Sequence, residues 1–91
     1  MSYFVYVLYS KNFDRFYYGQ TENLEARLLN HNNLKVSSTS KYCPWIIYAY
    51  KECESRQESM RFERQLKNLK SRLRVSEFII RKDFIICGAK R

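Results

Sequence analysis

The sequence predicts one domain of the α/β class, of the α+β type, with a core over about residues 2–84 and a tail over 85–91. Strands are expected in three aromatic and β-branched runs, at about 3–9, 15–19 and 45–50. Helices are expected where apolar residues recur at helical spacing, at about 22–32, from 55 onwards, and at 72–84. No internal repeat interrupts these elements, and no apolar run approaches the ~20 residues that span a bilayer.

The first two expected strands are joined by a turn-like polar segment, so they should form the arms of one hairpin. If Tyr9 paired with Asp14, then Tyr6 would lie directly opposite Tyr17, with both hydroxyls on one face. A slip of one residue, which pairs Tyr9 with Arg15, would separate the two phenols. The spacing therefore permits a site with two phenols but does not require one.

The first expected helix carries two candidate functional side chains. Thr21 is its expected N-cap, and Gly19 before it indicates a close backbone approach, an unusual dihedral angle or a simple turn. Arg27 lies on the flank of the buried stripe, one turn before His31. An arginine at such a rim is more often a surface residue, and a lone histidine there is more often structural. The stripe itself consists of Leu24, Leu28 and His31.

The third expected strand follows a polar segment, residues 33–40, which reads as a loop. Pro44 stops any helix there and favours an extended backbone before it. The run from Trp45 to Tyr50 is continuously apolar, which predicts a strand that is at least partly covered on both faces.

The second expected helix carries a candidate carboxylate. Ser55 and Glu58 have the spacing of a capping box, which marks the start of the helix. Glu63 lies about 100° round the helix from Phe62, and on spacing alone it should pair with Lys67, four residues on. The buried stripe is expected to consist of Phe62, Leu66 and Leu69. The third helix is expected to bury Val75, Phe78, Ile79 and Ile86.

The chain is strongly basic, with a formal net charge of +8 and a pI near 9.6. This charge favours a polyanionic partner, nucleic acid first and an anionic membrane surface second, whereas solubility alone is the simpler explanation. The charge is concentrated, because eight basic residues stand against two acidic ones over residues 61–82. The basic residues are Arg61, Arg64, Lys67, Lys70, Arg72, Arg74, Arg81 and Lys82, and the acidic ones are Glu63 and Glu77.

The cysteines favour a reducing compartment. Cys43, Cys53 and Cys87 are odd in number and widely separated, and with a single histidine they give no zinc-ligand pattern. We expect reduced packing thiols in a cytoplasmic protein. The N-terminus also lacks the basic region, apolar stretch and cleavage site of a secretory signal.

Several of these residues form an ordered set of motifs. In chain order they are Val5-Tyr6, Tyr17-Tyr18-Gly19, Arg27, His31-Asn32, Pro44-Trp45 and Glu63 to Lys67. Over about residues 2–80, this set resembles the GIY-YIG nuclease superfamily, specifically its small stand-alone branch with no attached DNA-binding domain. The resemblance implies a three-stranded antiparallel sheet with about three helices packed against it. The sequence departs from the family pattern at Phe4, where the first motif has a glycine, and at Gln20, where some relatives have a lysine.

The resemblance also implies a role for individual residues. Tyr6 and Tyr17 correspond to the paired tyrosines of the active site, Arg27 to the catalytic arginine and Glu63 to the metal-binding glutamate. His31 corresponds to a position near the scissile phosphate in some relatives, and Asn68 is a candidate for an asparagine used near the metal in some branches. One Mg²⁺ or Mn²⁺ ion is implied, and a single carboxylate with water as the remaining ligands suits Mg²⁺.

These residue types suit the hydrolysis of a phosphodiester. The planar guanidinium of Arg27 can hold two phosphate oxygens. A phenol has a pKa of about 10, so it activates water only where its anion is stabilised. We assign Tyr17 to activate or orient the water, with Tyr6 as its partner. The two roles could also be exchanged.

The expected function is a metal-dependent DNA endonuclease of low sequence specificity, acting in DNA repair or recombination. Its DNA-contacting residues are expected to be Lys41, Arg64, Lys67, Lys70, Arg72 and Arg74. Two alternatives remain open, a nucleic-acid-binding module of the same fold that has lost turnover and a protein-interaction domain.

Overall fold

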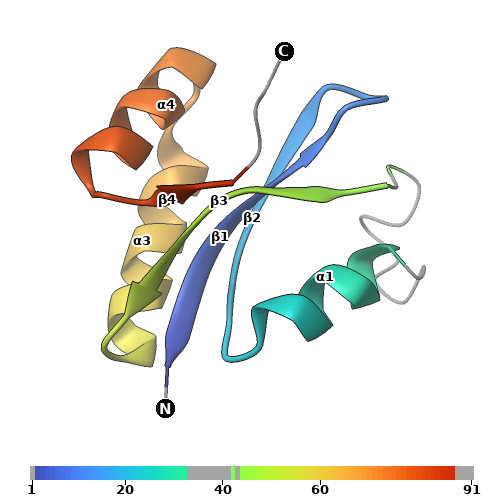
Figure 1. Ribbon diagram of the computed structural model, residues 1–91. Coiled ribbons are helices and arrows are strands. Elements are labelled where there is room, and N and C mark those ends of the chain that lie inside the picture. Colours follow the sequence, from blue (N-terminus) through green and yellow to red (C-terminus); the bar gives the residue numbers. More distant parts are fainter. Residues whose placement is uncertain (1, 33–41, 43, 88–91) are drawn as a thin grey trace.

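The computed structural model describes residues 2–32, 42 and 44–87. In this part of the chain one antiparallel sheet has the strand order β2-β1-β3-β4 (Figure 1). Its strands are β1 (Tyr3–Ser10), β2 (Arg15–Thr21), β3 (Ile46–Cys53) and β4 (Ile85–Ile86). The expected three-stranded sheet thus gains a short fourth strand, formed by residues that we expected to begin the tail.

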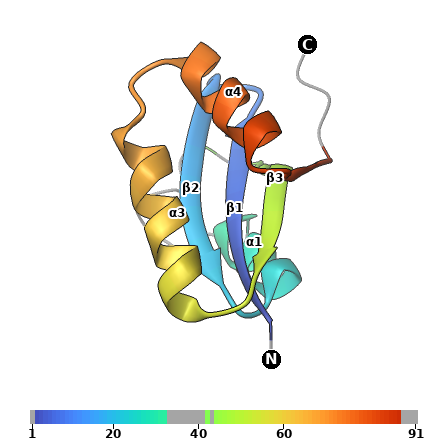
Figure 2. The same cartoon turned by 90° about the vertical axis from the view of Figure 1, so that its left-hand side faces the viewer.

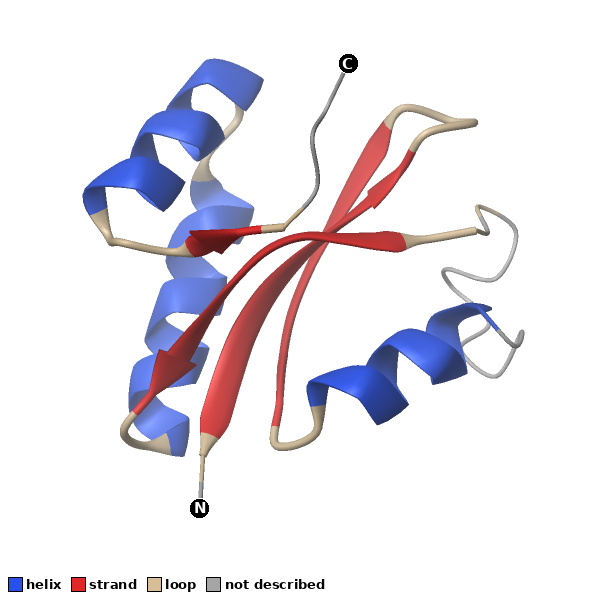
Figure 3. Cartoon of the chain, viewed as in Figure 1, coloured by secondary structure: helices blue, strands red, loops and turns tan. Residues whose placement is uncertain are grey.

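Helices cover both faces of the sheet. One face lies against α1 (Leu24–Asn32), and the other against α3 (Arg56–Asn68) and α4 (Arg72–Arg81) (Figures 1 and 3). The central strand β1 contributes to both cores because its side chains alternate between faces. Val5 and Val7 pack with the residues of α3 and α4, whereas Tyr6 and Leu8 pack on the side of α1.

Strand β3 is also covered on both faces, as its continuous apolar sequence predicted. Tyr48 and Ala49 join the core beside α3 and α4, whereas Ile47 and Tyr50 join the core beside α1. Two successive residues share a face because the pairing with β1 shifts by one residue between Val7 and Leu8, leaving Tyr48 as the extra residue of a bulge.

The turn of the β1–β2 hairpin is fixed to α4. Asp14 has a φ of 53°, a conformation that aspartate tolerates better than most residues. The Tyr9 hydroxyl donates to Asp14 Oδ1 at 2.7 Å, and Arg72 donates to the same oxygen and to the Asp14 carbonyl, each at 2.7 Å. The Arg72 guanidinium also lies over the Phe16 ring, 5.5 Å from its centroid. Arg72, which we expected to contact DNA, is therefore engaged within the fold.

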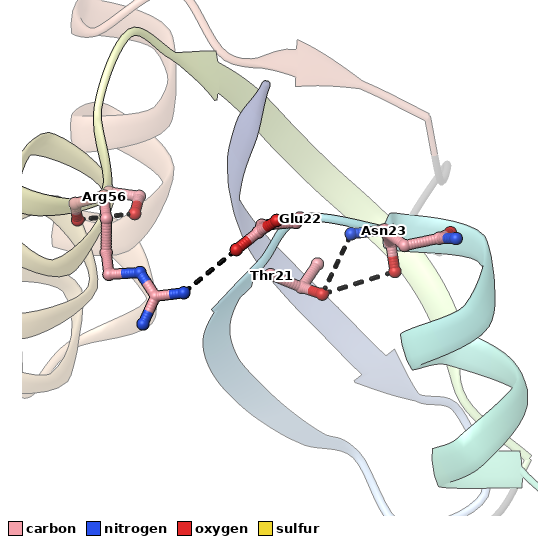
Figure 4. A network of polar contacts seen from close by, with 5 residues as sticks. Thr21, Glu22, Asn23 and Arg56 are labelled. Atoms are coloured by element: carbon pink, nitrogen blue, oxygen red, sulfur yellow. Dashed lines mark hydrogen bonds and ion pairs between the residues drawn. The ribbon is translucent and has the colours of Figure 1, made fainter. Parts of the chain in front are cut away.

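The start of α1 is capped by a different residue from the one expected. Asn23 Oδ1 accepts from the Ala26 amide at 3.1 Å. Thr21 Oγ1 instead accepts from the Asn23 amide at 3.1 Å, before the helix begins (Figure 4). Asn23 is therefore the N-cap. Between these residues, Glu22 forms an exposed ion pair with Arg56 of α3 at 2.9 Å, which links the two helix starts (Figure 4).

The predicted start of α3 is confirmed, because Ser55 is its N-cap and accepts from the Glu58 amide at 3.1 Å. Helix α4 ends at Arg81 and not near Phe84, since the chain turns at Asp83, with a φ of 61°. Val75, Phe78 and Ile79 are buried as expected, but Ile86 lies in β4 and is 52% exposed.

Cys53 is buried and Cys87 exposed, and both are free thiols; Cys43 lies outside the described residues. Burial raises the pKa of the Cys53 thiol, which suits a packing residue. None of the helices in the described part of the chain is long and apolar enough to cross a membrane.

Candidate active site

The two phenols lie on the face of the sheet that α1 covers. Tyr6 is opposite Gly19, and Tyr17 is opposite Leu8, so neither of the registers that we considered is the observed one. The observed register differs by two residues from the one that would pair Tyr6 with Tyr17. A shift of two keeps every side chain on its face, and the two tyrosine rings therefore still meet, with centroids 6.5 Å apart.

Gly19 makes room for the first phenol. A Cβ atom at this position would lie 2.6 Å from Tyr6 Cζ, a distance that no real packing tolerates. No glycine in the described residues has a positive φ, so Gly19 serves the close approach and not an unusual dihedral angle. The Tyr6 ring thus crosses the backbone of β2.

Arg27 of α1 reaches the Tyr6 hydroxyl. Its Nε donates to Tyr6 Oη at 3.1 Å, and Tyr6 is only 1% exposed. Burial raises the pKa of Tyr6 above its usual value of 10.0, and the nearby Arg27 charge lowers it only in part. Tyr6 is therefore a neutral phenol at pH 7 that holds Arg27 in place.

His31 completes the cluster from the next turn of α1. Its Nε2 lies 3.4 Å from Tyr6 Oη, and its ring packs edge-on against Tyr17, with centroids 4.9 Å apart. Burial, with a smaller effect of the Arg27 charge, lowers the pKa of His31 to about 4. His31 is accordingly neutral at pH 7, and the cluster carries the positive charge of Arg27.

The buried His31 predicts a pH dependence of stability. Between pH 6.5 and about 4 the unfolded chain binds a proton that the folded chain excludes, so stability falls as the pH is lowered through this range. We expect the free energy of unfolding to drop by about 2 kcal/mol between pH 7 and pH 5. Urea unfolding at the two pH values measures the drop, and the His31→Gln variant should lose most of it. An equal drop in that variant would contradict the assignment.

Asn32, the last residue of α1, was named in the sequence motifs without a role. Its Oδ1 accepts from the Trp45 amide at 2.6 Å, and its Nδ2 donates to the Trp45 carbonyl at 3.0 Å. Trp45 is 3% exposed and packs against Tyr17, with centroids 6.2 Å apart. The sequence signal for this contact was a polar residue directly after His31, but nothing in the spacing indicated its partner.

Glu63 lies on α3, which packs on the face of the sheet opposite to α1 and the phenols. That helix lies along the edge strand β2 (Figure 2). The Glu63 carboxylate forms an ion pair with Lys67 at 2.9 Å, as spacing alone predicted, and its side chain is 21% exposed. The Glu63 charge also contributes to the raised pKa of Tyr6, after the stronger effects of burial, Arg27 and Tyr17. Glu63 therefore acts on the phenol cluster through its field, whereas Tyr6, Tyr17, Arg27 and His31 are in direct contact.

A shallow hollow of about 340 Å³ opens beside this carboxylate. Its lining comes from α3 alone and consists of Met60, Glu63, Arg64, Lys67 and Asn68. In the described part of the chain, no group of three or more His, Cys, Asp or Glu side chains is arranged to hold a metal ion. Glu63 supplies the one carboxylate of this lining, and Asn68, the candidate named above for an asparagine near the metal, lines the same hollow.

Several residues expected to contact DNA are exposed on α3, on α4 and between them. Three of these exposed residues, Arg64, Lys70 and Arg74, form no ion pair described above. Lys67 is held by Glu63, and Arg72 by Asp14. Lys41 lies outside the described residues.

The fold and this cluster define a class of protein: an antiparallel sheet with helices on both faces, in which two phenols, a guanidinium and an imidazole converge under α1. The sequence profile of the GIY-YIG catalytic domain matches residues 2–75, and the chain belongs to this family of the nuclease superfamily. Among curated proteins, none matches the chain. The solution structure of the UPF0213 protein BH0048 from Bacillus halodurans is similar, with 29% identity and a TM-score of 0.55 over 90% of this chain and 86% of that chain.

Proposed function

We propose that the protein is a divalent-metal-dependent DNA endonuclease that hydrolyses phosphodiester bonds with low sequence specificity. The observation that supports this proposal is the convergence of Tyr6, Tyr17, Arg27 and His31 on one face of the sheet. A half-buried guanidinium that is fixed by a hydrogen bond to Tyr6 is suited to a phosphate, whose charge it neutralises without reorganisation. In this proposal one catalytic domain spans the chain, with a core over about residues 2–84 and a tail over 85–91 that begins with the short strand β4.

Each side chain in the cluster has a distinct part in the proposed reaction. Arg27 binds the oxygens of the scissile phosphate, and its Nε bond to Tyr6 fixes its direction. Tyr17 is half-buried and more exposed than Tyr6, so it is the phenol that orients the attacking water. The neutral His31 packs on Tyr17 and meets the Tyr6 hydroxyl, which fixes both phenols.

Members of the GIY-YIG family generally use a divalent metal, and Glu63 fits the binding of one ion. Its carboxylate is a hard oxygen ligand at the edge of an open hollow that admits water, which is the environment that Mg²⁺ or Mn²⁺ accepts. Lys67 now occupies this carboxylate and would have to swing away. A bound ion would stabilise charge on the phosphate and on the leaving oxygen.

The charge of the chain supports DNA as the partner. Contacts from Arg64, Lys70 and Arg74 would follow the phosphate backbone, and such contacts carry no sequence information. If each contacts one phosphate, log-log plots of affinity against salt should have a slope of roughly −3. We further propose a cytoplasmic role in DNA repair or recombination, consistent with the free thiols Cys53 and Cys87.

A second candidate function is a nucleic-acid-binding module without turnover, and the ion pair between Glu63 and Lys67 favours it because it occupies the only carboxylate assigned to the metal. The test is cleavage of labelled duplex, nicked, branched and single-stranded DNA with Mg²⁺ or Mn²⁺, in parallel with EDTA. We expect cleavage that requires the metal and weakens with salt. Salt-sensitive binding without cleavage of any substrate would replace the enzyme with the binding module. Absence of binding at moderate salt would leave the protein-interaction domain.

A further inference from the structure

The side-chain amide of Asn32 pairs with both backbone polar groups of one residue. It accepts from the Trp45 N–H at 2.6 Å and donates to the Trp45 C=O at 3.0 Å. The ladder between β1 and β3 begins at the next residue, where Ile46 is opposite Tyr9. Asn32 therefore extends the hydrogen bonding of β3 by one residue and attaches the end of α1 to the sheet.

The segment before β3 is held at a second point. The buried hydroxyl of Ser10, at the end of β1, donates to the Tyr42 carbonyl at 2.6 Å. The Tyr42 ring in turn packs edge-on against Trp45, with centroids 6.3 Å apart. Two side chains from separate elements thus fix the backbone that presents the Trp45 ring.

Trp45 forms one wall of the space around Tyr17, and His31 forms another. The ring centroids lie 6.2 Å and 4.9 Å from that of Tyr17, respectively. Asn32 directly follows His31 and directly binds Trp45, so one residue connects both walls. A displacement of either wall would let the Tyr17 ring turn.

We propose that Asn32 is a positioning residue for the active site: by clamping Trp45 to the end of α1, it fixes the orientation of Tyr17. The expected effect on kcat rests on the proposed nuclease function, whereas the contact between Asn32 and Trp45 can be tested without any activity. Only an amide offers an acceptor and a donor side by side at this reach. Alanine supplies neither group, and aspartate keeps the acceptor but loses the donor.

The test uses the single tryptophan of the chain as a reporter of the clamp. For Asn32→Ala we expect kcat for DNA cleavage to fall about 10²-fold, as misplacement of a catalytic group does, with KM changed less than about threefold. The fluorescence of the buried Trp45 should shift to longer wavelength and become accessible to acrylamide in the folded variant. Asn32→Asp, which keeps one hydrogen bond, should give the same changes and serves if Asn32→Ala does not fold.

The matched control is Val75→Ala, which creates a cavity in the core on the opposite face of the sheet. It should lower stability but leave kcat and the Trp45 emission unchanged. Unchanged emission in both Asn32 variants, or an equal loss of kcat in the Val75 variant, would overturn the positioning role. If the wild type cleaves no DNA, the nuclease proposal fails by itself, and the Trp45 emission still decides whether Asn32 is a clamp.

Discussion

Replacing Arg27 with alanine is expected to lower kcat for DNA cleavage about 10³-fold, as the loss of a guanidinium that stabilises phosphoryl charge does. The effect should be large because, among the described residues, the phenol cluster holds no second cation in direct contact with Tyr6. Arg27→Lys should recover little of the loss, since an ammonium keeps the charge but not the planar fork or the Nε–H that binds Tyr6. Single-turnover kinetics with saturating enzyme measure the chemical step directly.

The control for net charge is Lys11→Ala, in the exposed turn of the β1–β2 hairpin. It removes one positive charge far from α1 and should leave kcat unchanged. An Arg27→Ala variant that folds and retains more than a tenth of the wild-type kcat would show that the guanidinium does not contact the reacting phosphate.

Glu63→Gln is expected to have the second large effect, a loss of about 10³-fold in metal-dependent cleavage, because the amide is a much poorer ligand for a hard cation. The fold should survive, since an i, i+4 ion pair on a helix surface contributes only about 0.2–0.5 kcal/mol. Binding of Mn²⁺, followed by the relaxation of water protons, gives a readout that does not depend on catalysis. It should weaken in step with activity.

Two further variants sharpen the test of Glu63. Glu77→Gln, on the exposed surface of α4, is the matched carboxylate control and should leave Mn²⁺ binding unchanged. Lys67→Met removes the cation that now occupies the Glu63 carboxylate, so Mn²⁺ should bind more tightly. Wild-type affinity for Mn²⁺ in Glu63→Gln would remove this residue from the metal site.

Much of the fold followed from local patterns, because alternation and helical spacing are properties of short segments. The contact between the phenols could not be derived with certainty. The contact depends on the turn, because the pairing of Ser10 with Arg15 leaves four residues in the loop and so sets the register of the two strands. Sequence spacing alone allowed several registers. Only shifts by an even number keep Tyr6 and Tyr17 on one face, and the observed shift is one of these.

The remaining contacts join segments that are distant in sequence, and no local pattern reports them. Arg72, one of the expected DNA contacts, binds Asp14, 58 residues away, and no local pattern predicted that pair. Asn32 binds Trp45, 13 residues further along the chain, and no helical or strand spacing predicts a contact between these two residues. Conversely, the pair between Glu63 and Lys67 is local, and spacing predicted it. Helical spacing predicts this ion pair but carries no information about metal binding by the Glu63 carboxylate.

The fourth strand has a consequence of its own. β4 pairs only with Ala49 and Tyr50 and closes that margin of the sheet with two residues, Ile85 and Ile86. A neighbouring chain that approached this margin would meet a strand too short to guide further pairing, and short edge strands are a common protection against aggregation. Its detachment would free the backbone groups at Ala49 and Tyr50, in the middle of β3, and so lengthen the stretch of edge that could pair with another chain.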